Sequence, residues 1–401
     1  MASNVPEIVV AGHVCLDMIP TFRSGVSGSA IPALENILVP GKLTDVGPLT
    51  TATGGAVSNT GLALYRLGFP VSLMGKVGDD TVGHAILDIL RGYDQALADG
   101  MIVTTESHSS YTVVINVPGI DRIFLHSPGA NDTFGADDID YTKLDGAKLF
   151  HFGYPPVMRR MFVDGGEELA ALLGRVKARG LTTSLDMARP DPTSDAGKAP
   201  WRQILAKALP QLDLFLPSFD EVLYMLDRRR FDDMVHGGGD PDMQADAELV
   251  QEIAEELIEM GVAVVGLKLG NQGLYMKAAA DPQRIAAAGA CAPKDPATWA
   301  GREMLAPCFR TRVVGTTGSG DCTIAGFLGA FLRELSPEEV MTAAVAVGAC
   351  CVEAADATSS IPEWKTVEQR IADHWQRLHT VTPHGWRWDE EGMVFRPGAE
   401  K

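Results

Sequence analysis

The sharpest chemical feature of this 401-residue sequence is a glycine-rich turn that leads directly into a helical pattern. The segment Val313-Val-Gly-Thr-Thr-Gly-Ser-Gly-Asp321 is followed by apolar residues at helical spacing between Ile324 and Leu335. Unpaired N–H groups and the helix dipole attract anions to the start of a helix, and Gly318 and Gly320 would let a ligand approach the backbone. The pattern therefore indicates a phosphate site with a carboxylate beside it.

A structural interpretation of the same turn is equally simple. Asp321 would cap the helix and the glycines would only shape the turn, and the turn taken alone favours this interpretation. The Lys-Ser/Thr pair of a P-loop is missing, the glycine spacing differs from that of a dinucleotide fingerprint, and protein-kinase signatures are absent. A nicotinamide oxidoreductase therefore has no motif to support it.

Two further features could bind a hydroxylated ligand. Thr53-Gly54-Gly55-Ala-Val-Ser-Asn59 is a second glycine turn before a helix, and the amide of Asn59 can both donate and accept hydrogen bonds. Asp17 follows the first predicted strand, and ligands of doubly wound sheets bind beyond the carboxyl ends of strands. Each has an ordinary alternative, since Asn is a common N-cap and solvated Asp residues are frequent at strand ends.

Alternating strands and helices must position these residues. The patterns predict strands over residues 7–12, 71–75, 149–152, 182–186, 212–217 and 262–269, and helices over 59–67, 81–92, 164–179, 201–209 and 250–258. Repeated β-α-β units predict an α/β fold: a doubly wound, mostly parallel central sheet with helices on both faces. Residues 18–53 and a hairpin with strands at 111–117 and 122–126, turning at Pro118–Asp121, predict a small separate β-sheet.

Composition excludes several classes of protein. The chain has 34 Lys and Arg against 52 Asp and Glu, a net charge of −18, which argues against nucleic acid or an anionic membrane as the main partner. No apolar run approaches the roughly 18 residues of a membrane span. The six Cys show no C-x-x-C pair and are expected to be free thiols in a reducing compartment. We therefore expect a soluble cytoplasmic protein.

Taken in order, the motifs resemble the two signatures of the ribokinase-like (PfkB) carbohydrate kinase family. The first signature is carried by Gly54-Gly55…Asn59, Gly68 and Gly75-Lys-Val-Gly78-Asp-Asp80…Gly83, and the second by Gly315-Thr-Thr-Gly-Ser-Gly-Asp321. The resemblance extends to about Trp364. It implies a ribokinase-like fold whose small sheet is a lid, and an enzyme that moves the γ-phosphate of ATP to a sugar hydroxyl. It also reverses the preference for Asp321 as a mere cap.

The family's functional positions fall on definite residues here. The resemblance implies that Asp321 is the catalytic base and that the amides of Gly318, Ser319 and Gly320 form the anion hole. It implies sugar contacts from Asp17, Gly54, Gly55 and Asn59, and nucleotide contacts from Ser218, Glu221, Gly270 and Gly273. Lys268 stands where relatives often have Thr, and it would either contact a nucleotide phosphate or only cover the end of its strand. Glu221 would also hold Mg²⁺. Gly129-Ala-Asn131 and Asp186…Arg189 fall where the family has similar residues.

Three residues depart from the family's pattern. Ser218 replaces the Asn that lies three residues before Glu221, so magnesium binding is expected to be altered rather than absent. Gly315 stands where relatives often have an Asp that helps to hold a monovalent cation, which puts potassium activation in doubt. Cys15 replaces an Asn of ribokinase itself, which weakens any assignment of ribose as the substrate.

The resemblance also divides the chain. Residues 1–17, 54–101 and 128–373 are expected to form the α/β nucleotide- and substrate-binding domain, residues 18–53 and 102–127 the lid, and residues 374–401 a C-terminal tail. Lid edges pair in relatives, so the partners expected are a small sugar, ATP with Mg²⁺, and a second copy of the chain. A nucleoside kinase of the same fold and a non-catalytic sugar-sensing protein are the alternatives.

Overall fold

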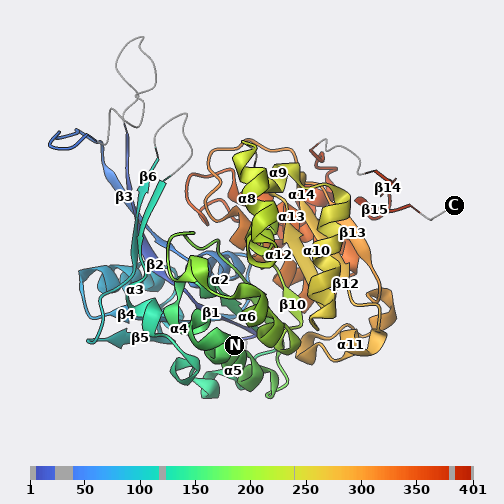
Figure 1. Ribbon diagram of the computed structural model, residues 1–401, viewed down its shortest axis with the longest axis horizontal. Coiled ribbons are helices and arrows are strands. Elements are labelled where there is room, and N and C mark those ends of the chain that lie inside the picture. The colour runs from blue at the N-terminus through green and yellow to red at the C-terminus, as the bar shows by residue number, and fades with distance from the viewer. Residues whose placement is uncertain (1–5, 23–38, 117–122, 239, 379–383, 399–401) are drawn as a thin grey trace, which may run out of the picture.

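The computed structural model describes residues 6–22, 39–116, 123–238, 240–378 and 384–398. Two sheets make up its β-structure, one of eleven strands and one of four (Figure 1). The predicted turn at Pro118–Asp121 and much of the predicted 18–53 segment lie outside the described residues.

The large sheet is parallel in its middle and antiparallel at one edge. Its strand order is β14-β15-β13-β12-β11-β10-β9-β8-β1-β4-β5. Pairing is parallel from β11 through β10, β9, β8, β1 and β4 to β5, and antiparallel from β11 outward to β14. The strands are β1 (Ile8–Gly12), β4 (Val71–Gly78), β5 (Met101–Thr104), β8 (Leu149–Gly153), β9 (Thr182–Asp186), β10 (Leu214–Phe215), β11 (Val264–Lys268), β12 (Leu274–Ala278), β13 (Glu303–Ala306), β14 (Trp386–Asp389) and β15 (Val394–Pro397).

Helices cover both faces of this sheet, which confirms the predicted doubly wound α/β class. One hydrophobic core joins a face of the sheet to α2, α3, α12, α13 and α14, and a second joins the other face to α4, α5, α6, α7 and α10. The helices are α2 (Ala56–Arg66), α3 (Thr81–Tyr93), α4 (Arg159–Phe162), α5 (Glu167–Lys177), α6 (Trp201–Ala208), α7 (Phe219–Leu226), α8 (Arg228–His236), α9 (Pro241–Gln244), α10 (Ala247–Glu259), α11 (Pro282–Ala286), α12 (Ser319–Leu332), α13 (Pro337–Cys351) and α14 (Trp364–Ala372).

The small sheet has the order β3-β2-β6-β7 and stands out from the body of the molecule (Figure 1). Its strands are β2 (Cys15–Pro20), β3 (Leu49–Gly54), β6 (Tyr111–Ile115) and β7 (Ile123–Ser127). The predicted hairpin is present as the antiparallel pair β6–β7. The small sheet begins at Cys15, so Asp17 lies within a strand rather than in a loop after the first strand.

The C-terminal residues carry an element that the sequence patterns did not indicate. β14 and β15 pair antiparallel, and β15 joins β13 at the edge of the large sheet. A cavity of about 580 Å³ lies between this hairpin, α13 and α14, and none of the predicted site residues lines it. Among the described residues, no helix has the length and apolar character needed to cross a bilayer.

Candidate active site

The second glycine turn ends where α12 begins, and it places Asp321 in the first turn of that helix. Gly318 is the N-cap and has φ 73°, a left-handed conformation that favours glycine. Asp321 is buried, with 3% of its surface exposed. The N-cap position is held by Gly318, so Asp321 is not the N-cap residue of α12.

Asp321 instead bonds to residues from two other elements. Nδ2 of Asn59, in the first turn of α2, donates to Oδ2 at 3.0 Å. The hydroxyl of Tyr154, just beyond β8, lies 2.9 Å from Oδ1 and 2.8 Å from Oδ2. The Thr60 hydroxyl donates to Oδ1 at 3.4 Å. Gly55, with φ 86°, is the N-cap of α2, so Asn59 is free to face the carboxylate.

Burial sets the protonation chemistry of this group. It raises the pKa of Asp321, while Lys268 and the hydrogen bond from Asn59 act against the rise. Burial and the negative charges of Asp321 and Asp186 raise the pKa of Tyr154 well above its usual range. Tyr154 therefore stays protonated, and its hydroxyl donates a hydrogen bond to the carboxylate. A buried carboxylate with a raised pKa is suited to accept a proton from an alcohol.

Asp17 lies on β2, near Gly54 at the end of the neighbouring strand β3. A Cβ atom on Gly54 would come within 2.4 Å of Oδ2 of Asp17, so any larger residue at position 54 would clash with this carboxylate. The Cys15 thiol donates to Oδ1 of Asp17 at 3.4 Å. Burial raises the pKa of Asp17, hydrogen bonds from Cys15 and Thr112 oppose the rise, and the charge of Asp321 adds to it. The two carboxylates are therefore close enough for the charge of Asp321 to act on the pKa of Asp17.

A second group of charges surrounds Lys268 at the end of β11. Its Nζ atom lies 2.8 Å from Oδ1 of Asp186, and the side chains are 12% and 1% exposed. Burial alone would lower the pKa of Lys268, but Asp186, Glu221 and Asp321 together raise it, so it is a fixed cation. Burial raises the pKa of Asp186 to about 6 despite the opposing charge of Lys268.

Ser218 and Glu221 lie next to Lys268 at the start of α7. The N–H of Ser218 donates to Oε2 of Glu221 at 2.7 Å, so Glu221 completes a capping box. Ser218 also forms an isolated bridge with Lys268. Burial raises the pKa of Glu221 well above its usual range, against the charge of Lys268. Oδ2 of Asp186 is buried without a hydrogen-bond partner, which leaves a carboxylate oxygen available at this place.

Lys268 connects the two groups. A Cβ atom on Gly320 would lie 3.4 Å from its Nζ atom, so the ammonium group lies beside the turn at the start of α12. The N–H of Ser319 donates to the Thr316 carbonyl at 3.3 Å and must leave it to reach an anion. Gly270, in the short turn after β11, and Gly273, with φ 117°, lie outside these contacts.

Several polar residues near Asp321 were not predicted from the sequence. Tyr154 is the most direct of these, and His13 lies beside it, with ring centroids 6.0 Å apart. Tyr154 has φ 68° and follows the last residue of β8, a position that the strand-end rule for doubly wound sheets could have indicated. Asn131, which the family resemblance did single out, accepts a hydrogen bond from the N–H of Val14 and donates one to its carbonyl, and so fixes the loop after β1.

Comparison with known proteins decides the family. The family model described as pfkB family carbohydrate kinase matches residues 28–364. The chain belongs to the pfkB family of carbohydrate kinases. A protein from Archaeoglobus fulgidus named as an uncharacterized sugar kinase is 25% identical over 302 residues, which cover 75% of this chain and 98% of that protein.

Solved structures share the fold of this pfkB kinase. The Arabidopsis thaliana ribokinase complexed with ribose and ATP has a TM-score of 0.66 and 18% identity, covering 91% of this chain and 98% of the other. An E. coli structure assigned to ribokinase II, with ATP and Mg²⁺, has a TM-score of 0.63 and 18% identity, covering 92% of this chain and 100% of the other. The ribokinase-like fold is thus confirmed, and the protein is an enzyme that phosphorylates a sugar.

Proposed function

We propose that this kinase transfers the γ-phosphoryl group of ATP to a hydroxyl group of a small sugar or sugar derivative, with Asp321 as the base. The observation that carries the proposal is the carboxylate of Asp321. It is buried at the start of α12, bonded by Asn59 and Tyr154, and close enough to Lys268 for that cation to act on its pKa.

The acceptor sugar would lie between Asp321 and the small sheet. Asp17 and Asn59 provide an acceptor and an amide suited to sugar hydroxyls, and Gly54 and Gly55 leave room beside them. The small sheet would act as a lid that excludes water from this space. Two observations support a lid. The small sheet stands out from the main body, and Asp17 of the proposed sugar site lies on one of its strands.

The nucleotide would lie on the other side of Asp321. Lys268 and the amides of Gly318, Ser319 and Gly320 would stabilise the charge that develops on the transferred phosphoryl group. The loop at Gly270 and Gly273 would border the nucleotide. ATP is bound in several solved structures of this fold.

The residues near Ser218 fit a magnesium ion. Mg²⁺ prefers carboxylate oxygens and retains several waters, and the unpartnered Oδ2 of Asp186 and the carboxylate of Glu221 supply such oxygens. When bound, Mg²⁺ would neutralise phosphate charge. The Ser218 hydroxyl would contact a water or a phosphate where the family has an amide. Gly315 has no side chain to hold a monovalent cation, and independence from potassium stays a prediction.

Every proton and bond in the proposed transfer is accounted for by the sugar, ATP and Asp321. The sugar hydroxyl gives its proton to Asp321 as its oxygen forms a bond to the γ-phosphorus, and the bond from that phosphorus to the bridging oxygen of ADP breaks. Asn59 and Tyr154 hold the carboxylate in position to receive the proton. Product release returns the proton to solvent.

The test measures ADP formation with a panel of sugars, and with adenosine, inosine and guanosine. Asp321→Asn should lower turnover by about 10²- to 10⁴-fold, the usual contribution of a general base. Asp88→Asn is the matched control, because its exposed carboxylate on α3 pairs with Arg91 and lies outside the predicted motifs. Sugar-dependent turnover of Asp321→Asn within tenfold of the parent would show that the base is misassigned. Turnover with a nucleoside alone would make the enzyme a nucleoside kinase.

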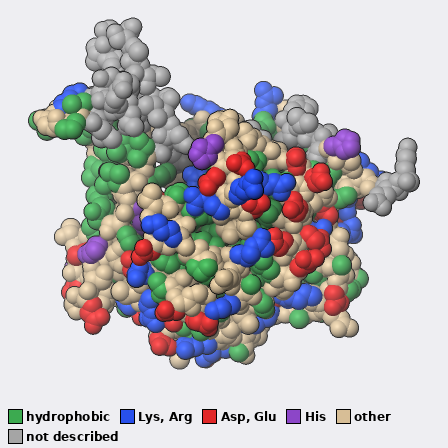
Figure 2. All heavy atoms as spheres, in the orientation of Figure 1, with side chains coloured by type: hydrophobic (Ala, Val, Ile, Leu, Met, Phe, Trp, Pro, Cys, Tyr) green, Lys and Arg blue, Asp and Glu red, His purple; other side chains and the backbone are tan. Residues whose placement is uncertain are grey.

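We also propose that two copies associate through the small sheet. Leu49, Phe124 and Leu125 are each more than half exposed on its strands, and Figure 2 shows hydrophobic side chains gathered there. Apolar side chains that gather on one part of a surface are typical of interfaces. Light scattering should give the dimer mass for the parent and the monomer mass for Leu125→Glu. A monomeric parent would contradict the association.

A further inference from the structure

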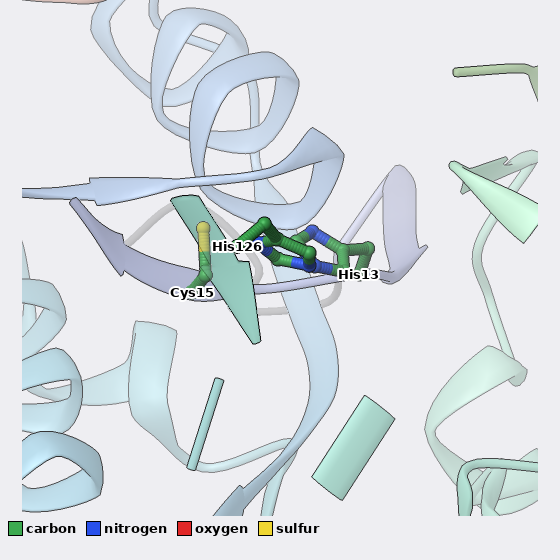
Figure 3. Close-up of side chains that lie close together, drawn as sticks. All are labelled: His13, Cys15 and His126. Carbon is green, nitrogen blue, oxygen red and sulfur yellow. The ribbon is translucent and has the colours of Figure 1, made fainter. Parts of the chain in front are cut away.

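Three side chains with nitrogen or sulphur donors meet near the predicted sugar site. His13 comes from the loop between β1 and β2, Cys15 from the first residue of β2, and His126 from β7 of the small sheet. One donor atom from each lies within 4.8 Å of the others (Figure 3). The rings of His13 and His126 have centroids 5.1 Å apart.

Within the part of the chain that the structure describes, two members of this cluster, His13 and Cys15, lack strong hydrogen-bond partners. His13 is buried, and neither Nδ1 nor Nε2 has a hydrogen-bond partner among the described residues. A buried imidazole normally bonds through at least one nitrogen, so the observation needs an explanation. The Cys15 thiol makes only long contacts, at 3.4 Å to Asp17 and 3.6 Å to Thr112.

Thr112 contacts both His126 and Cys15. Its hydroxyl lies 3.0 Å from Nδ1 of His126 and 3.6 Å from the sulphur of Cys15. Contacts of this kind orient the side chains that ligate a metal and are part of the design of such sites. The cluster therefore combines two imidazoles and one thiol with a hydroxyl group, that of Thr112, which contacts both His126 and Cys15.

We propose that His13, Cys15 and His126 form a binding site for a borderline transition-metal cation, represented by Zn²⁺. Imidazole and thiolate ligands suit Zn²⁺, whereas Mg²⁺ and Ca²⁺ prefer oxygen. Bond lengths of about 2.0–2.3 Å place tetrahedral ligands roughly 3.3–3.6 Å apart, so the cluster must contract by little more than an ångström. Binding forms a sulphur–metal bond, and the thiol proton goes to solvent.

The cation would have a structural and a functional effect. It would tie His126 on the small sheet to His13 beside the large sheet, and so hold the two sheets together. Cys15 bonds to Asp17, so the cation would also occupy the acceptor end of the site. This second effect rests on the proposed function, and it makes the cation a competitor of the sugar and not of ATP.

The test uses Co²⁺ as a spectroscopic probe on the full-length protein without substrates. One equivalent should give the visible bands of tetrahedral cobalt and a near-ultraviolet thiolate-to-cobalt band, and Zn²⁺ should abolish both. Cys15→Ser should lose the thiolate band. His126→Ala, on an exposed position, should weaken Co²⁺ affinity by at least about 100-fold, because loss even of an outer-sphere partner costs 10- to 100-fold. Cys308→Ser is the matched control and should keep both bands.

The outcomes separate the proposal from the kinase function. Absence of a thiolate band in the parent, or its persistence in Cys15→Ser, overturns the metal site whatever the activity is. Normal spectra without any sugar kinase activity would support the metal site and reject the proposed reaction. Where turnover is found, Zn²⁺ should raise the apparent KM for the sugar and leave that for ATP unchanged. At a constant concentration of free Zn²⁺, inhibition that ATP relieves would contradict the location.

Discussion

Replacement of Lys268 by Met tests whether the charges around the phosphate site depend on one another. The ammonium group lies 2.8 Å from Asp186, and both side chains are almost fully removed from water. Met keeps most of the length and apolar stem of Lys while removing its charge. Asp186 and Glu221 would then be buried without the cation that now lowers the pKa of each.

The expected loss is large because the remaining carboxylates stay buried. Removal of one partner from a buried ion pair costs about 3–5 kcal/mol, most of it from the uncompensated charge. Lys268→Met should therefore lower the free energy of unfolding in urea by that amount at neutral pH. The double variant Lys268→Met/Asp186→Asn should regain part of the loss, since it removes the orphaned charge as well as the cation.

Lys277→Met provides a matched control on the neighbouring strand. Lys277 pairs with Glu255 and Glu303, but it is 20% exposed and Glu255 is more exposed still. Its loss should cost only about 1 kcal/mol, as expected for a partly solvated pair. An unfolding free energy of Lys268→Met within 1 kcal/mol of the parent would refute the dependence of these charges on one another, and so would a double variant no more stable than Lys268→Met.

Three further changes test individual contacts. Tyr154→Phe removes the donor to both oxygens of Asp321 and should lower kcat by about tenfold or more, because hydrogen bonds to charged groups contribute about 1.5–3 kcal/mol; an unchanged kcat would exclude a positioning role. Gly54→Ala places a methyl group within 2.4 Å of Asp17 and should raise the KM for sugar but not for ATP, so equal changes in both would count against a sugar contact. Asp186 has a folded pKa of about 6, above the unfolded value, so the folded state binds the extra proton. The parent should therefore lose up to about 3 kcal/mol of unfolding free energy relative to Asp186→Asn between about pH 4 and pH 7, measured in urea, and a pH-independent difference would refute the shift.

Local sequence patterns were sufficient for the parts of the molecule that repeat. Buried parallel strands are nearly continuous apolar runs, which is why β1 and β9 could be placed within a residue or two. The start of α12 was predicted because glycines followed by helical spacing have one common interpretation. The small sheet was predicted only in outline, since a hairpin pattern does not say that β2 pairs parallel with β6.

The residues that were missed have ordinary sequence surroundings. Tyr154 follows a strand and precedes two prolines, and nothing local shows that its hydroxyl reaches a residue 167 positions away. His13 and His126 lie 113 positions apart, and only the pairing of the small sheet brings their rings together. The β14–β15 hairpin has two exposed residues in a four-residue first strand, which leaves little apolar pattern to recognise.

Asp321 shows how the structure separates two interpretations that the local sequence allows. A capping carboxylate bonds to N–H groups two or three residues ahead, so a cap is complete within one turn of helix. Asp321 bonds to Asn59 instead, 262 positions away, and to Tyr154. Three elements meet only because β1 and β8 are adjacent and α2 packs on both. Removing a carboxylate from water is costly, and a role in proton transfer would give the burial of Asp321 a chemical use.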